Sequence, residues 1–226
     1  VTDISLTLGN EFNLFEIDAN HAKKLSIQNP VISNEDLDKI KFIDHEDFEA
    51  VTITTLYEIN NGLNGLESAL DDMINEVNKA LVRGANIIIL SDRGVSPGLA
   101  PIPMLLATSH THHAFKRLKK RSQFGIIIES AEPREPHHIS MLFGYGASAI
   151  NPYMVNEIIS YQIKNKIIKD ISVEKAINNF NKAIAKGIVK VMNKIGISTL
   201  NSYRGAQIFE ALGLNNEFID KYFPDL

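Results

Sequence analysis

Cysteine is absent from this chain of 226 residues. Its absence excludes a disulfide framework, a thiolate zinc site and a cysteine nucleophile within the chain, and it fits a reducing compartment. The sequence also lacks an apolar run long enough to cross a membrane, and it lacks internal repeats and low-complexity tracts. We therefore expect a globular protein with no membrane partner.

An excess of charge of one sign is missing as well. Lys and Arg number 23 and Asp and Glu number 27, which gives a formal net charge of −4. There is no basic face of the size that nucleic-acid binding needs, so we expect no nucleic-acid partner. The one basic run, KRLKKR at 116–121, ends an apolar helical pattern, where cations complement the helix dipole. Hydrophobic residues make up 44% of the chain, enough for a core without metal staples.

Familiar catalytic patterns are missing too. The chain has no G-x-S-x-G elbow and no credible Ser-His-Asp order. Residues 144–149, GYGASA, mimic the dinucleotide fingerprint, but a helical pattern precedes them and an extended one follows, which is the reverse of what that fingerprint requires. We therefore interpret these glycines as a helix cap. The loop at 92–103 contains three prolines and is interpreted as a rigid connector.

Extended and helical patterns alternate along the chain. Strands are predicted at 50–59, 87–90, 124–128 and 148–151, and helices at 66–83, 102–120, 136–143 and 173–195. This order predicts a parallel sheet covered by helices. Ser33 is expected to cap an earlier helix, and Gly196 to close the helix that ends at Ile195. Another helix is expected near Ala206.

Five of the seven histidines fall between residues 110 and 138. His110 and His113 would share a face of a helix, while His137 and His138 follow the next strand. No carboxylate stands at helical spacing beside them, so packed or hydrogen-bonded imidazoles are favoured over a metal site.

Charged residues gather after the third predicted strand. Glu129, Glu132, Arg134 and Glu135 lie there, followed by two histidines. Because chemistry gathers at the C-terminal ends of parallel strands, this loop could perform acid–base catalysis. The alternative, an ion-paired loop at an interface, is favoured.

Several motifs together resemble the central region of glutamate synthases. They are LSDR at 90–93, APIP at 100–103, R-E-x-H-H at 134–138, GYGASAINPY at 144–153 and KVMNKIGISTLNSYRGAQIFEALGL at 190–214. The last run is the closest match. Pro136, Asn193 and Ile195 depart from the usual family residues, and none of the three stands at a position expected to be catalytic.

The resemblance implies a large cytoplasmic or plastid enzyme of nitrogen metabolism. Such an enzyme transfers the amide nitrogen of glutamine to 2-oxoglutarate and forms two glutamates. FMN and an iron–sulfur cluster serve the whole enzyme, and ferredoxin or an NAD(P)H-reducing subunit supplies electrons. The central domain resembles a reduced FMN barrel, so the implied fold is α/β, a partial TIM-like β/α barrel with mainly parallel strands. This chain itself is expected to hold no cofactor, metal or catalytic residue, and to be cut from a longer polypeptide.

The implied organisation has three parts: an N-terminal extension at 1–45, a central β/α domain at 46–196 and a junction at 197–226 that leads into the FMN barrel. The implied role is to hold the neighbouring glutaminase and FMN domains in register and to wall the ammonia tunnel between them. Candidate tunnel or interface residues lie in loops at strand ends: Thr54, Thr55, Ser91, Asp92, Glu132, Arg134, Glu135, His137 and His138. Two alternatives remain: a stand-alone β/α enzyme that uses the 129–138 loop, and a free scaffold or docking subunit.

Overall fold

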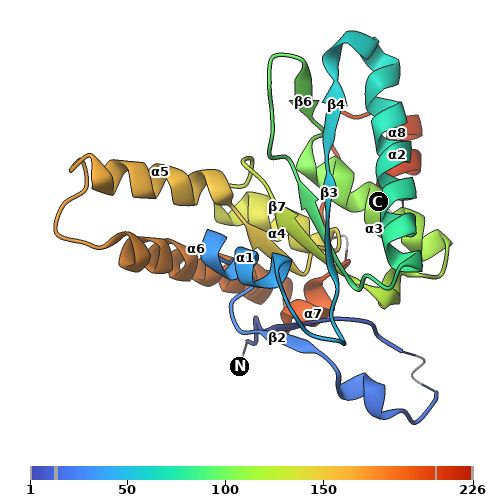
Figure 1. Ribbon diagram of the computed structural model, residues 1–226, viewed down its shortest axis with the longest axis horizontal. Coiled ribbons are helices and arrows are strands. Elements are labelled where there is room, and N and C mark those ends of the chain that lie inside the picture. Colours follow the sequence, from blue (N-terminus) through green and yellow to red (C-terminus); the bar gives the residue numbers. More distant parts are fainter. Residues whose placement is uncertain (1, 13–14, 207, 225–226) are drawn as a thin grey trace.

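The computed structural model describes residues 2–12, 15–206 and 208–224 (Figure 1). Its centre is a sheet of four parallel strands in the order β3-β5-β7-β8. These strands are β3 (Ala50–Thr54), β5 (Ile87–Ser91), β7 (Gly125–Glu129) and β8 (Ala149–Asn151). Parallel strands that neighbour one another in chain order form about half of a β/α barrel sheet. The predicted fold class, a partial TIM-like α/β arrangement, is confirmed.

Helices connect the strands and pack against the sheet. The longer ones are α2 (Gly62–Val82), α3 (Met104–Arg117), α4 (Pro136–Gly144), α5 (Tyr153–Lys164) and α6 (Val173–Ile195). The shorter ones are α1 (Asn34–Lys41), α7 (Leu200–Tyr203), α8 (Asn216–Tyr222), η1 (Ala19–Ala22), η2 (Ile59–Asn61) and η3 (Arg121–Gln123). Helices α5 and α6 run side by side and project away from the sheet (Figure 1). No helix within the described ranges is both long and apolar enough to cross a bilayer.

The sheet has a buried core on each face, because its two central strands are apolar at nearly every position. Alternate side chains of these strands, such as Ile88 and Ile126, belong to the larger core, which includes residues of α2, α3, α4 and α6. The intervening side chains, such as Ile89 and Ile127, belong to a second core on the opposite face.

The N-terminal segment covers this second face. It supplies Leu8 from β1 (Leu6–Leu8), Ile27 from β2 (Leu25–Ile27), and Leu37 and Ile40 from α1. Strands β1 and β2 form an antiparallel pair that the sequence patterns did not predict. In a closed barrel this face of the sheet would point to the barrel interior. The N-terminal segment thus occupies the space that further barrel strands would enclose.

The strand predicted at 50–59 changes partner at Thr55. The Thr55 amide donates to the carbonyl of Ser91 at 2.8 Å, but the Thr55 carbonyl accepts from Ile102 N at 2.7 Å. The chain then continues as β4 (Leu56–Glu58), which pairs antiparallel with β6 (Leu99–Pro101) beyond the end of the main sheet (Figure 1). Side-chain alternation carries no information about a change of hydrogen-bond partner, so the sequence indicated one long strand.

Helix ends match the sequence more closely, with one exception. Ser33 Oγ accepts from Asp36 N at 3.1 Å, and Gly196 closes α6 in the left-handed region at φ 85°. The prediction of a helix that starts near Ala206 is wrong. Helix α7 ends at Tyr203, because the Gly205 amide donates instead to the carbonyl of Phe143 at 3.2 Å, and α8 begins ten residues after the expected start.

Candidate functional site

Two buried carboxylates stand at the C-terminal ends of neighbouring strands. Asp92 follows β5 and is 1% exposed, and Glu129 ends β7 and is 2% exposed. This edge of the sheet carries the active site in β/α barrels. The surroundings of these two groups therefore decide whether the chain has the geometry of an active site.

Glu129 is bound by three donors from two parts of the chain, the end of α1 and the end of β5. Lys41 Nζ, at the end of α1, lies 2.9 Å from both carboxylate oxygens. Ser91 Oγ donates to Oε2 at 2.7 Å, and Arg93 Nε donates to Oε1 at 2.6 Å. Burial alone would raise the pKa of Glu129, but hydrogen bonds from these three donors outweigh it and hold the pKa below its usual range. The carboxylate is therefore ionised and saturated with donors.

Arg93 extends this network toward α5. Its η1 nitrogen donates to Glu157 at 2.9 Å, and its guanidinium carbon lies 3.9 Å from the centre of the Tyr153 ring. A guanidinium stacked on an aromatic face is stabilised by a cation–π interaction. Arg93 thus connects β5, β7 and α5, and its charge is already balanced by two carboxylates.

Asp92 organises the loop that follows β7. Ser130 Oγ donates to its Oδ2 at 2.5 Å, and the amide of Ala131 donates to the same atom at 3.1 Å. Tyr153 lies on its other side, where burial and then the Asp92 charge raise the pKa of the phenol well above its usual range. Asp92 therefore holds the start of the loop and stabilises the neutral form of Tyr153.

The other charged and histidine side chains of the predicted loop are exposed, and they make two separate sets of contacts. Glu132 accepts from the amide of Met104 at 3.0 Å, at the start of α3. Protein atoms around its carboxylate raise the pKa of Glu132, and the charge of Asp92 acts in the same direction. His138 Nε2 lies 3.2 Å from Glu135, and the His137 ring contacts Phe209 edge-on with 5.8 Å between centroids. Arg134 is exposed, and its amide lies 3.4 Å from His138 Nδ1.

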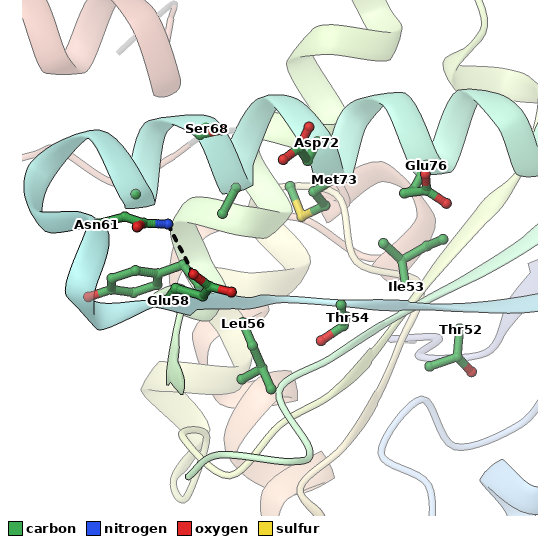
Figure 2. A pocket seen from close by; sticks show the side chains of 13 residues that line it. Thr52, Ile53, Thr54, Leu56, Glu58, Asn61, Ser68, Asp72, Met73 and Glu76 are labelled. Carbon is green, nitrogen blue, oxygen red and sulfur yellow. Dashed lines mark hydrogen bonds between the residues drawn. The ribbon is translucent and has the colours of Figure 1, made fainter. Parts of the chain in front are cut away.

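Two pockets contain predicted residues. The smaller, about 200 Å³, is lined by Leu105, Glu132, Pro133, His138, Met141 and Leu142. The larger, about 630 Å³, lies between α2 and the β3–β4 segment and includes Thr54 (Figure 2). Its lining also contains the carboxylates of Glu58, Asp72 and Glu76.

The nine predicted residues are therefore not one site. Ser91 and Asp92 belong to the buried networks, Glu132 and His138 line the smaller pocket, and Thr54 lines the larger one. Thr55 is fully buried, and its hydroxyl has no hydrogen-bond partner in the described part of the chain. The other three are exposed around the start of α4.

Sequence reasoning missed two contributors, Lys41 and Tyr153. Lys41 ends α1, in a charged stretch of the sequence that predicted only a helix, and Tyr153 begins α5 just after β8. The LSDR motif did contain a usable signal, because Arg93 directly follows the buried Ser91-Asp92 pair.

The histidines are not gathered into one cluster, although the His112 and His113 rings lie edge-on to each other with 5.1 Å between centroids. The His110 ring lies edge-on to the Tyr222 ring, with 5.2 Å between the ring centroids. His112 Nδ1 accepts a hydrogen bond from Arg121 Nε at 3.1 Å. In the residues the structure describes, no group of three or more His, Asp or Glu side chains could hold a metal ion.

The groups at these strand ends do not fit a flavin. A flavin phosphate needs free hydrogen-bond donors and cations. The buried groups here are instead the carboxylates Asp92 and Glu129, and the nearby cations Lys41 and Arg93 already bind Glu129.

Comparison with known proteins identifies the family. A family model described as the glutamate synthase central domain matches residues 1–215. The chain belongs to the glutamate synthase central-domain family. This central domain is 41% identical over 223 residues to the glutamate synthase [NADPH] large chain of Bacillus subtilis, a match that covers 99% of this chain and 14% of that protein. It is 37% identical to the glutamate synthase [NADH] of Schizosaccharomyces pombe, a match that covers 99% of this chain and 11% of that protein.

The chain thus spans a small part of the length of these relatives. Among solved structures, a double mutant of flavocytochrome b2 with pyruvate bound aligns with a TM-score of 0.50 at 13% identity. The alignment covers 96% of this central domain and 50% of that chain. At this identity the likeness concerns the fold alone.

Proposed function

We propose that this chain is the central, non-catalytic domain of a glutamate synthase, which converts glutamine, 2-oxoglutarate and a reductant into two glutamates. The observation that carries the proposal is the match of 99% of the chain to glutamate synthases of which it forms 14% or less. In this proposal FMN and an iron–sulfur cluster bind to other parts of the same polypeptide. The whole enzyme lies in the cytoplasm or a plastid. Ferredoxin or NAD(P)H supplies the electrons.

The saturated carboxylates support a non-catalytic role. A general acid or base must reach the proton that it transfers. Glu129 and Asp92 hold the barrel-like position, yet each binds donors of its own chain. Their role in this proposal is to fix the loops that face the glutaminase and FMN domains.

The smaller pocket is the better candidate for a wall of the ammonia tunnel. Ammonia must stay unprotonated to act as a nucleophile, which requires an apolar wall that excludes water. Four of the six lining residues, Leu105, Pro133, Met141 and Leu142, are apolar. The larger pocket contains three carboxylates, which would stabilise ammonium instead.

An immunoblot combined with an activity assay tests the assignment. An antibody raised against this chain is expected to detect a polypeptide several times larger than 25.2 kDa. Purified, that polypeptide forms glutamate from glutamine and 2-oxoglutarate, whereas the 226-residue chain alone turns over neither. A native band at 25.2 kDa, or turnover by the chain alone, would contradict the proposal.

A further inference from the structure

A third pocket lies at the opposite end of the sheet, where β7 begins. It measures about 260 Å³, and its lining includes Glu11, His112, Arg121, Phe124 and Arg204. We call it the arginine pocket. None of its residues belongs to the predicted tunnel or interface set, and neither of the carboxylate networks described above reaches it.

Arg121 enters this pocket with only neutral partners. Its Nε donates to His112 Nδ1 at 3.1 Å, and its two terminal nitrogens donate to the carbonyls of Phe124 and Gly146, each at 2.7 Å. No carboxylate of the described residues hydrogen-bonds to it. Partly buried cations in proteins are ordinarily paired with an anion, because desolvation of an unpaired charge is costly. Arg121 therefore has no carboxylate bonded to it, and the charge of Glu11 acts on it only at longer range.

Arg204 adds a second cation to the same pocket. Its side chain is 17% exposed and donates to Ser148 Oγ at 2.9 Å. Burial lowers the pKa of Arg121 to about 9, and the charge of Arg204 acts in the same direction. Burial also lowers the pKa of Arg204. Arg121 is still protonated at neutral pH, so two positive charges line the pocket.

One carboxylate partly compensates these charges. Glu11 Oε1 lies 3.4 Å from Arg204, a long contact, and the Glu11 side chain is 49% exposed. Lys24 brings a further positive charge near Glu11 and Arg204. Three cations thus share one half-exposed carboxylate, which leaves the pocket electropositive.

His112 fixes the position of the Arg121 side chain in this pocket. Burial, with the charge of Arg121, lowers the pKa of His112 to about 3, so the ring is neutral at physiological pH. Because Nδ1 accepts from Arg121, the ring proton is assigned to Nε2. Gly146, at φ 107°, packs so closely that a side chain there would collide with Nδ1. The ring is therefore held with its N–H donor on the side of Gly205, another residue that packs against it.

We propose that the arginine pocket binds a small oxyanion, a carboxylate or a phosphate, between Arg121 and Arg204. Guanidinium groups bind both classes of anion with short, charge-assisted hydrogen bonds. The bound anion supplies negative charge beyond that of the half-exposed Glu11, the one carboxylate of the described residues that the three cations share. This proposal does not depend on the function assigned above, because it rests on the opposite end of the sheet.

Calorimetric titration of the purified protein with inorganic phosphate, and separately with acetate, tests the proposal. Saturable binding of at least one of the two anions is expected, and the preferred anion separates the phosphate source from the carboxylate source. R204Q should weaken binding about tenfold or more, because it removes a charged donor. E11Q should tighten it, because it removes the competing carboxylate.

R117Q is the matched control. It removes one positive charge from the exposed end of α3, outside the pocket, and should leave the affinity within about twofold. The E11Q result stands even where R204Q fails to fold, since Glu11 is half exposed. The proposal is overturned if neither anion binds, if E11Q does not tighten binding, or if R117Q weakens it as much as R204Q.

Discussion

Lys41 and Glu129 are 88 positions apart in the sequence, and the Lys41 ammonium lies 2.9 Å from both oxygens of the Glu129 carboxylate. This pair joins the last residue of α1 to the last residue of β7. It therefore fastens the N-terminal segment to the sheet at the edge where a barrel enzyme would place its active site. At that position this protein has an ion pair that holds α1 against the sheet.

Breaking this pair should destabilise the fold strongly. K41M or E129Q leaves a charged group without its partner in a mostly buried site, and each is expected to lower the free energy of unfolding by about 3 kcal/mol. K39M is the control, because Lys39 pairs only with exposed carboxylates on its own helix and should cost less than about 1 kcal/mol. Urea denaturation measures all three. Equal costs for K41M and K39M would contradict the role assigned to the pair.

The same pair predicts a loss of stability in acid. The pKa of Glu129 is lowered in the folded protein, so the ionised carboxylate contributes stability above the unfolded pKa of about 4.3 and loses it as the pH falls further. The difference in unfolding free energy between wild type and E129Q should be constant above about pH 5.5 and shrink below about pH 4. A difference that stays unchanged down to pH 3 would show that Glu129 titrates as it does in the unfolded chain.

His110 predicts a separate effect at higher pH. Burial lowers its pKa to about 4, and neither ring nitrogen has a hydrogen-bond partner among the described residues. The unfolded imidazole takes up a proton near pH 6.5 and the folded one does not, so stability falls as the pH drops below that value. H110F keeps an aromatic ring that packs on Tyr222. Between pH 7 and pH 5 the unfolding free energy of H110F should fall by about 2 kcal/mol less than that of the wild type.

H45F, which replaces an exposed imidazole, is the control for H110F. Urea denaturation at both pH values gives the comparison. If H45F and H110F change the pH dependence equally, burial of His110 is not the cause.

Gly187 lies where α6 packs closely against Pro136, the first residue of α4. A Cβ atom there would lie 2.5 Å from Cγ of Pro136, in a rigid ring. Helix propensity alone would make G187A stabilising by about 1 kcal/mol, but the collision should reverse the sign and destabilise by about 1–2 kcal/mol. In a P136G background, which removes both Cβ and Cγ of residue 136, the same substitution should become stabilising. Thermal or urea unfolding decides, and a stabilising G187A in the native background would mean that the helices are not in close contact.

The two central strands and the caps of α1 and α6 could be predicted because their signals are local. Ile87–Leu90 is apolar at every position, and Ser33 and Gly196 stand where capping residues are expected. Pattern alone left open whether the sheet is an open one or part of a barrel; the barrel-like form followed from the resemblance.

The candidate site was predictable only in part, because its contacts are non-local. Ser91, Asp92 and Glu129 follow strands and could be marked as strand-end residues, but Lys41 pairs with Glu129 across 88 positions. The arginine pocket was hidden for the same reason. Arg121 ends a basic run that predicts a solvated helix end, whereas its guanidinium turns inward to the carbonyls of Phe124 and Gly146.

The central claim, that this domain walls the path of ammonia without catalysing a step, is tested by the balance of substrates consumed by the full-length enzyme. L105K places a cation in the wall of the smaller pocket, and L118K places one at an exposed position beyond the end of α3. We predict that L105K consumes more glutamine than 2-oxoglutarate and releases the excess as free ammonium, while L118K and wild type consume the two substrates equally. Equal consumption by L105K, at an unchanged rate, would contradict the account.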